Sequence, residues 1–194
     1  MDDGVNLRKV LTMNTPHPPL PDMHTREALL AHVAHTLSFY HPRAIDPTGG
    51  FYHFLKDDGT VFDAHTRHLV SSTRYVFLWA MAARHFPNEP AYLDNARRAF
   101  AFLRAAHRQP ESGGYAWVLH WQDGQAKVLD GTNHCYGLAF VLLAHAHALM
   151  AGIEEARPGL EETFALMEAR FWQPEYGLYA DEASADWRVL SPYR

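Results

Sequence analysis

Residues 133–150 read Asn-His-Cys-Tyr-Gly-Leu-Ala-Phe-Val-Leu-Leu-Ala-His-Ala-His-Ala-Leu-Met, and this stretch decides the fold. It predicts a helix with apolar residues on nearly every face, which should be surrounded by protein and not half immersed in water. The first turn of this helix is polar, since it holds Asn133, His134 and Tyr136 directly after a turn. We therefore expect an inner helix whose N-terminal end presents polar side chains to a cavity.

Similar helices flank this stretch. A second apolar helix should begin at Ser71 or Ser72 and end before Pro87. Three further segments have apolar residues at helical spacing, and they predict helices at residues 25–40, 89–108 and 158–171. Short hairpins should precede the apolar helices, with their turns at residues 57–59 and 121–124.

Turns that combine glycine with an aromatic residue recur at a fixed interval. Phe51, Tyr115 and Tyr179 are spaced 64 residues apart. Such a period is typical of helical hairpins that stack or close into a ring, because each hairpin buries its apolar face only against its neighbours. Alternating apolar and amphipathic helices favour a double ring with the apolar helices inside. A ring of six hairpins would need about twice the length of this chain. The chain should thus hold about three helical hairpins, with short β-hairpins over one rim.

Composition restricts the class of protein. The chain has 194 residues, of which 47% are hydrophobic and 13% aromatic, and we expect residues 23–194 to form one domain. Residues 1–22 are polar and rich in proline, which predicts a flexible N-terminal arm. A net charge of −5 and a pI near 6.2 give no electrostatic reason to expect nucleic acid or an anionic membrane as partner.

The cysteine content, the histidine spacing and the length of the apolar runs argue against disulfides, metal sites and membrane spans. Cys135 is the single cysteine, which excludes an intramolecular disulfide and a thiolate zinc cluster and predicts a reducing compartment, the cytoplasm. No apolar run reaches the roughly 18 residues that a membrane span needs. His145 and His147 stand two residues apart on a predicted helix, so their side chains diverge and no metal site is expected.

Polar and aromatic residues gather where the inner helices should begin. Arg74 lies inside the second apolar helix, where it needs a carboxylate partner or a ligand. Tyr115 and Trp117 follow a glycine turn and either pack or line a ligand. Asn133 either caps a helix or contacts a ligand. Aromatic rings beside guanidinium and amide groups suit a neutral sugar, whose C–H faces pack on rings while its hydroxyls bond polar groups.

Five stretches together resemble the N-acylglucosamine 2-epimerase superfamily. They are Gly49–Leu55, Arg67–Arg74, Gly113–Trp117, Asn133–Leu138 and Arg188–Arg194. The resemblance implies an all-α (α/α)6 toroid and an aldose–ketose isomerase of the mannose/fructose type, or a 2-epimerase, acting on unphosphorylated monosaccharides. It further implies a cis-enediolate, histidines as acid and base, and no cofactor.

The resemblance also implies residue roles. By position, the substrate-binding residues would be Arg74, Tyr115, Trp117, Asn133 and Arg194. The two arginines would hold sugar oxygens, where positive charge stabilises an enediolate. The catalytic histidines of the family would lie beyond Arg194, so no catalytic residue is expected in this chain. We expect the isolated chain to have little or no turnover and to self-associate through the exposed half-barrel face.

Two other classes of protein stay open at this point. A glycoside hydrolase on the same toroid would need two carboxylates that face one sugar bond, and Asp130 and Asp181 are the candidates. A non-catalytic sugar-binding module built from helical hairpins would bind sugars without converting them. Activity on a disaccharide would indicate the first class, and binding without conversion the second.

Overall fold

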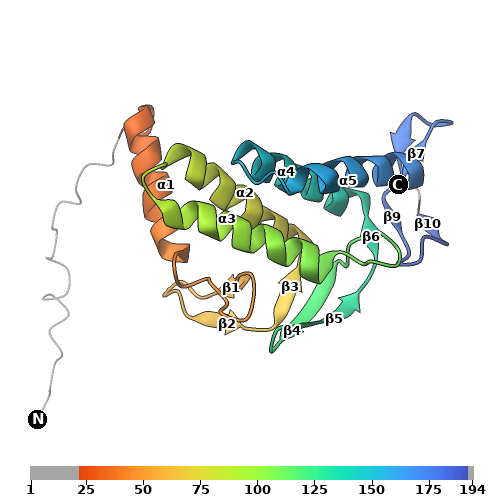
Figure 1. Cartoon of the computed structure of the whole chain (residues 1–194), viewed down its shortest axis with the longest axis horizontal. Coiled ribbons are helices and arrows are strands. Elements are labelled where there is room, and N and C mark those ends of the chain that lie inside the picture. Colours follow the sequence, from red (N-terminus) through yellow and green to blue (C-terminus); the bar gives the residue numbers. More distant parts are fainter. Residues whose placement is uncertain (1–21, 192–194) are drawn as a thin grey trace, which may run out of the picture. The chain divides into compact units, whose positions relative to one another are not determined.

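The computed structural model of the protein describes residues 22–191, and Figure 1 shows the course of the chain. The chain divides into two units, one up to Ser38 and one from Phe39 onward. The first unit holds most of helix α1 (Arg26–Tyr40). This helix begins after Thr25, whose hydroxyl accepts a hydrogen bond from the backbone nitrogen of Ala28 at 3.2 Å. The predicted arm at residues 1–22 lies outside the described residues except for its last position.

Four helices of the second unit form two hairpins. Helix α2 (Leu69–His85) packs on α3 (Pro90–Phe102), and α4 (Cys135–Met150) packs on α5 (Ala156–Arg170). The two apolar helices α2 and α4 also pack on each other, so the hairpins are adjacent (Figure 1). The predicted pairing of each apolar helix with an amphipathic partner is confirmed.

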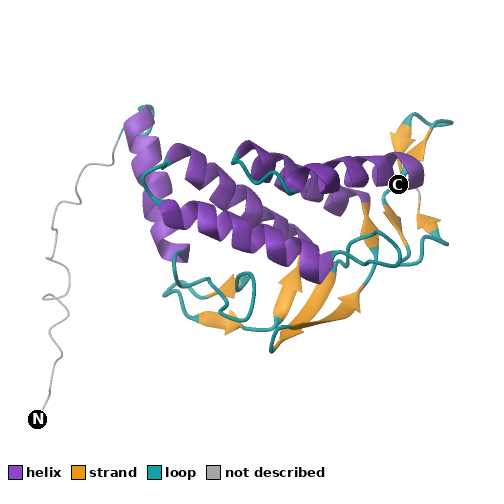
Figure 2. Ribbon diagram, viewed as in Figure 1, coloured by secondary structure: helices purple, strands orange, loops and turns teal. Residues whose placement is uncertain are grey.

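Short antiparallel strands lie outside the helical layer (Figure 2). The four small sheets of the described residues are β1 (Phe54–Leu55) with β2 (Val61–Asp63); β3 (Thr66–His68), β4 (Val118–Gln122) and β5 (Gln125–Asp130) in this order; β6 (Asn133–His134), β9 (Glu182–Ala183) and β10 (Leu190–Ser191) with β9 central; and β7 (Trp172–Gln173) with β8 (Leu178–Tyr179). Strands β3 and β6 run directly into α2 and α4. Strand pairing therefore fixes where the two inner helices begin.

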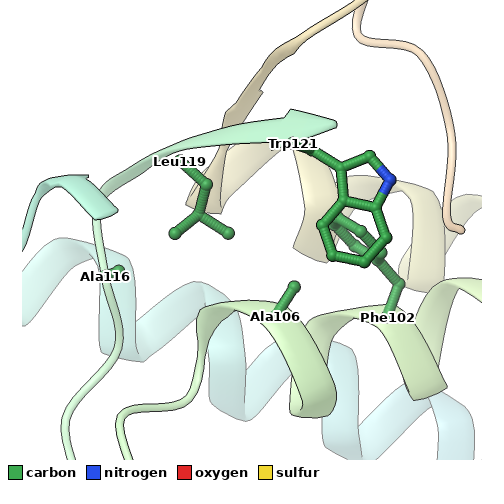
Figure 3. Close-up of a cluster of buried hydrophobic side chains, with 5 residues drawn as sticks. All are labelled: Phe102, Ala106, Ala116, Leu119 and Trp121. Atoms are coloured by element: carbon green, nitrogen blue, oxygen red, sulfur yellow. The ribbon is translucent and has the colours of Figure 1, made fainter. Parts of the chain in front are cut away.

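The core of the second unit extends from α2 to the strands. Val76 and Trp79 of α2 are fully buried. A cluster at the end of α3 joins the helices to β4 (Figure 3), and its members are Phe102, Ala106, Ala116, Leu119 and Trp121. Within it, the rings of Phe102 and Trp121 meet edge to face with centroids 4.9 Å apart. This packing holds the predicted hairpin against the helical layer.

Several helix boundaries differ from the prediction. Helix α2 begins at Leu69 and α4 at Cys135, because the residues that precede Leu69 and those expected to open α4 belong to strands. The helix expected at residues 89–108 is α-helical only to Phe102, and residues 103–107 form a π-helical turn. Of the two roles considered for Asn133, the helix cap is excluded. Asn133 lies in β6, and the residue at the cap position is His134.

A buried ion pair fixes the loop that precedes the first hairpin. The Arg67 Nη2 lies 2.5 Å from the Asp46 Oδ2, and both side chains are buried. The guanidinium of Arg67 also lies over the ring of Tyr52, with its carbon 5.3 Å from the ring centroid. The other carboxylate oxygen of Asp46 accepts a hydrogen bond from the backbone nitrogen of Thr48 at 2.9 Å. The pair thereby connects the 46–52 loop to β3.

A chain of hydrogen bonds lies beside the N-terminal end of α2. The His107 Nδ1 is 2.9 Å from the carbonyl oxygen of Ala116, so this nitrogen donates, and its Nε2 accepts from the hydroxyl of Ser72 at 2.9 Å. The His53 Nδ1 accepts from the backbone nitrogen of His68, which leaves the proton of His53 on Nε2, 3.4 Å from the same hydroxyl. Both imidazoles are therefore neutral. Burial lowers the pKa of His107 to about 4 and holds the pKa of His53 well below its ordinary value.

Candidate functional site

Each inner helix begins at a histidine that follows a short strand. Strand β3 passes into α2 at His68, and β6 passes into α4 at His134. The Nδ1 of His68 accepts a hydrogen bond from the backbone nitrogen of Val70 at 3.3 Å and so caps α2. The His134 side chain makes no capping bond and is free to meet other groups.

Trp117 lies against both of these histidines. Its ring centroid is 4.3 Å from that of His68 and 4.0 Å from that of His134. Its backbone is fixed on both sides, because its carbonyl accepts from the nitrogen of Leu69 at 2.9 Å and its own nitrogen donates to the carbonyl of Asp130 at 2.8 Å. Trp117 therefore fills the space between the starts of α2 and α4.

Gly137 allows this close approach. A Cβ atom at this position would lie 3.0 Å from the Leu69 Cδ2 and 3.0 Å from the Trp117 Cζ3. Both contacts would be tighter than most Cβ contacts in proteins, so the Leu69 and Trp117 side chains would have to shift. A glycine in the first turn of α4 thus lets the indole ring lie directly on the helix.

Arg74 of α2 projects from the same pair of helices. Its side chain is exposed, and its guanidinium carbon lies 5.3 Å from the ring centroid of Phe140 on α4. The Phe140 ring in turn lies 4.9 Å from that of Tyr136, which is 54% exposed. Within residues 22–191 Arg74 has no carboxylate partner. Its N–H groups are available to a ligand, and its exposure removes the need for a buried counter-charge.

Charge coupling connects these groups. The pKa of His68 is lowered by burial first, and then by electrostatic interaction with His134 and Arg74, while Asp130 opposes the shift. The pKa of Asp130 is lowered, chiefly because its carboxylate accepts a hydrogen bond from the backbone nitrogen of Thr132 at 2.9 Å. Near neutral pH this surface therefore combines a neutral imidazole, a guanidinium and a carboxylate.

Glu182 adds a second carboxylate. It pairs with His134 across strands β6 and β9, and its Oε2 lies 3.4 Å from the His134 Nδ1. The two side chains are 43% and 20% exposed, respectively, so both reach solvent. This contact could not be predicted from the sequence alone, because it depends on the pairing of β6 with β9.

Asn133 and Tyr115 are buried and bonded to each other. They are 2% and 3% exposed, and the Asn133 Oδ1 accepts a hydrogen bond from the Tyr115 backbone nitrogen at 3.1 Å. The Asn133 Nδ2 donates to the carbonyl of Ser184 at 3.2 Å. Burial raises the pKa of Tyr115, and the neighbouring Thr163 of α5 opposes this shift. These two side chains do not share the surface of Arg74, and their contact with a ligand remains a prediction.

The structure thus places Trp117 between His68 and His134, while Arg74 is close enough to His68 to lower its pKa. Arg194 lies outside the described residues. The sequence feature that could have identified these two histidines is their position at the polar start of an apolar helix.

The described residues contain no group of three His, Cys, Asp or Glu side chains that could hold a metal ion. Among the same residues, no helix has the length and apolar character needed to cross a membrane.

Helical hairpins whose apolar inner helices begin at one polar, aromatic surface define a protein of the (α/α)6 toroid class. The profile of the N-acylglucosamine 2-epimerase (GlcNAc 2-epimerase) family matches residues 49–194, which is more than half of the chain. The chain belongs to this family. The expected resemblance and the expected fold class are both confirmed.

Individual relatives agree with this assignment. A D-mannose isomerase from Marinomonas mediterranea is 49% identical over 174 residues, which cover 90% of this chain and 43% of that protein. A cellobiose 2-epimerase from Eubacterium cellulosolvens is 30% identical over 108 residues, covering 56% of this chain and 26% of the relative. A solved D-mannose isomerase structure superposes with a TM-score of 0.83 at 48% identity, over 90% of this chain and 43% of the other. The chain spans less than half the length of these relatives.

Proposed function

We propose that the protein is an aldose–ketose isomerase of the mannose/fructose type and that this chain supplies part of its sugar site. The observation that carries the proposal is the 49% identity to a D-mannose isomerase over 90% of the chain. The exposed guanidinium of Arg74 beside the rings of Phe140 and Tyr136 supports it. An apolar ring surface next to strong hydrogen-bond donors is the combination that binds an unphosphorylated monosaccharide.

The proposed reaction removes a proton from C2 of the open-chain aldose and returns one to C1 through a cis-enediolate. Arg74 would hold sugar oxygens and stabilise the negative charge that develops on them. Trp117 would pack on a C–H face of the sugar. Tyr115, Asn133 and Arg194 are kept as further proposed contacts. The histidines that transfer the proton between carbons would be contributed beyond Arg194, and no cofactor is needed.

The experiment follows fructose release from D-mannose. A longer protein that contains this chain should form fructose, and Arg74→Ala should lower kcat/KM by about 100-fold, since a charge-assisted contact to the reacting oxygens is lost. The matched control is Arg97→Ala, an exposed arginine of α3 that pairs with Asp94. Failure to form fructose from mannose would refute the isomerase proposal. An unchanged kcat/KM in Arg74→Ala would refute the role of Arg74.

Epimerisation at C2 is the second candidate reaction. The 30% identity to a cellobiose 2-epimerase favours it, because both reactions begin by removing the same C2 proton. The two differ in the carbon that is reprotonated. Product analysis of one mannose incubation separates them, since isomerisation gives fructose and epimerisation gives glucose.

We further propose that copies of this chain associate through the exposed half-barrel face, to which α4 contributes. Leu143 and Met150 are 38% and 56% exposed and stand seven residues apart, so they form one stripe along the helix. Light scattering after gel filtration should show a mass that rises with protein concentration. Leu143→Glu should abolish this rise in mass, whereas Phe164→Glu, at an exposed position on α5, should leave it intact.

The single cysteine supports a further proposal, that the protein works in the reducing cytoplasm.

A further inference from the structure

The pair formed by His134 and Glu182 has no role in the proposed sugar contacts. The two residues are cross-strand partners, with the His134 Nδ1 3.4 Å from the Glu182 Oε2. The Trp117 ring packs on the imidazole with a centroid distance of 4.0 Å. One carboxylate and one indole ring therefore hold the orientation of His134, as expected for an imidazole that transfers a proton.

The partner of Nδ1 decides where the proton of His134 resides. Glu182 offers no donor, so the neutral tautomer that suits this 3.4 Å contact is the one with hydrogen on Nδ1. The Nε2 then bears a lone pair, and within residues 22–191 it has no hydrogen-bond partner. The nitrogen that could accept a proton is thus the one left free for a ligand.

His68 has the opposite arrangement. Its Nδ1 accepts the backbone N–H of Val70, so the neutral ring carries its proton on Nε2. This nitrogen can donate a hydrogen bond to a sugar oxygen but cannot take a proton. The two histidines beside Trp117 are therefore not equivalent, and only His134 can act as a base.

We propose that His134, oriented by Glu182, opens the hexose ring and makes this chain a catalyst of mutarotation. The inference rests on the proposed sugar site around Arg74. In the step, the His134 Nε2 takes the proton from the anomeric O1–H as the C1–O5 bond breaks and C1=O1 forms. The imidazolium then delivers that proton to O5. The charge of Glu182 stabilises the imidazolium in between. Atoms and charge balance without a co-reactant, and the product is the open-chain aldose that isomerisation requires.

Polarimetry tests the proposal on the 194-residue chain itself. Crystalline α-D-mannopyranose is dissolved, and its change in optical rotation is followed with and without protein. We expect a saturable acceleration that His134→Gln lowers by about 100-fold, the lower range for a positioned proton-transfer group. The matched control is His85→Gln, an exposed histidine at the far end of α2, which should retain the full rate. This control also removes the contribution of surface imidazoles in general.

Glu182 is a positioning residue, and its variants are read differently. Glu182→Gln keeps the shape but loses the charge, so kcat for mutarotation should fall while the KM for mannose stays unchanged. Glu182→Asp should restore part of kcat. A merely structural role would change KM and the unfolding midpoint instead.

Calorimetric titration with mannose separates the two proposals. Binding with acceleration that depends on His134 supports both. If mannose binds but the wild-type chain accelerates mutarotation no more than His134→Gln does, the ring-opening role is overturned and the sugar site stays intact. Absence of binding and of acceleration overturns the sugar site and this inference together. Should His134→Gln unfold, the kcat of Glu182→Gln decides, and an unchanged kcat overturns the proposal.

Discussion

The Asn133 side chain connects the Tyr115 backbone to the loop after β9. Its Oδ1 accepts the Tyr115 N–H at 3.1 Å, and its Nδ2 donates to the Ser184 carbonyl at 3.2 Å. Three segments that are distant in sequence thereby meet at one buried amide. This connection holds β6 beside β9 and thus brings His134 to Glu182.

Gly114→Ala should break this connection. A Cβ at Gly114 would lie 2.0 Å from the Asn133 Oδ1, so the amide must move and leave buried polar groups unpaired. We expect a loss of about 2 kcal/mol in the free energy of unfolding, measured from the urea midpoint. In an Asn133→Ala background the same change should cost clearly less, because the clash is gone. Equal costs in both backgrounds would contradict the role of Asn133.

Acid should destabilise the second unit through His107. The imidazole is neutral in the fold with its pKa lowered to about 4, whereas the ordinary value is 6.5. Between these values the unfolded chain binds a proton that the folded chain does not. The stabilisation is therefore complete above pH 6.5 and is lost as the pH falls toward 4, by about 3 kcal/mol for this histidine.

Urea midpoints between pH 7.5 and 4.5 measure this slope. His107→Gln should flatten it, although the variant is less stable at pH 7.5. His85→Gln, at an exposed position, should keep the wild-type slope. A slope that is identical in wild type and His107→Gln would show that another group governs acid unfolding.

Removing one member of the buried ion pair should be costly. Arg67→Met leaves the Asp46 carboxylate buried without its partner. We expect a loss of about 3 kcal/mol or more in the free energy of unfolding. The control is Arg97→Met, which removes an exposed i, i+3 pair with Asp94 and should change stability by no more than about 0.5 kcal/mol. Thermal unfolding monitored by circular dichroism measures both variants.

Gly137→Ala should displace Trp117 from α4. The added methyl group would meet both the indole ring and Leu69 at 3.0 Å. We expect a weaker affinity for mannose, by about tenfold, together with a loss of about 2 kcal/mol in stability. Tryptophan fluorescence should shift to longer wavelength as the ring gains exposure. The matched control is Gly152→Ala. A Cβ at Gly152 would meet no atom within 4 Å, so this change adds only backbone strain at a glycine turn and should leave the affinity for mannose unchanged.

The sequence by itself determined the helices and their pairing. The 64-residue spacing of Phe51, Tyr115 and Tyr179 and the difference between apolar and amphipathic helices follow from local periodicity, which is written into the order of residues. Local spacing also identified Arg74 and Trp117 as residues near the starts of the inner helices. Such features need no knowledge of distant contacts.

Only the tertiary structure decided where α4 begins, what Asn133 bonds and which carboxylate meets His134. Pairing of β6 with β9 draws Asn133 and His134 out of the helix that their local sequence predicts. The reason is that backbone groups at a helix start bond equally well to a neighbouring strand, and a strand contributed by a distant segment leaves no periodic signal near residue 133.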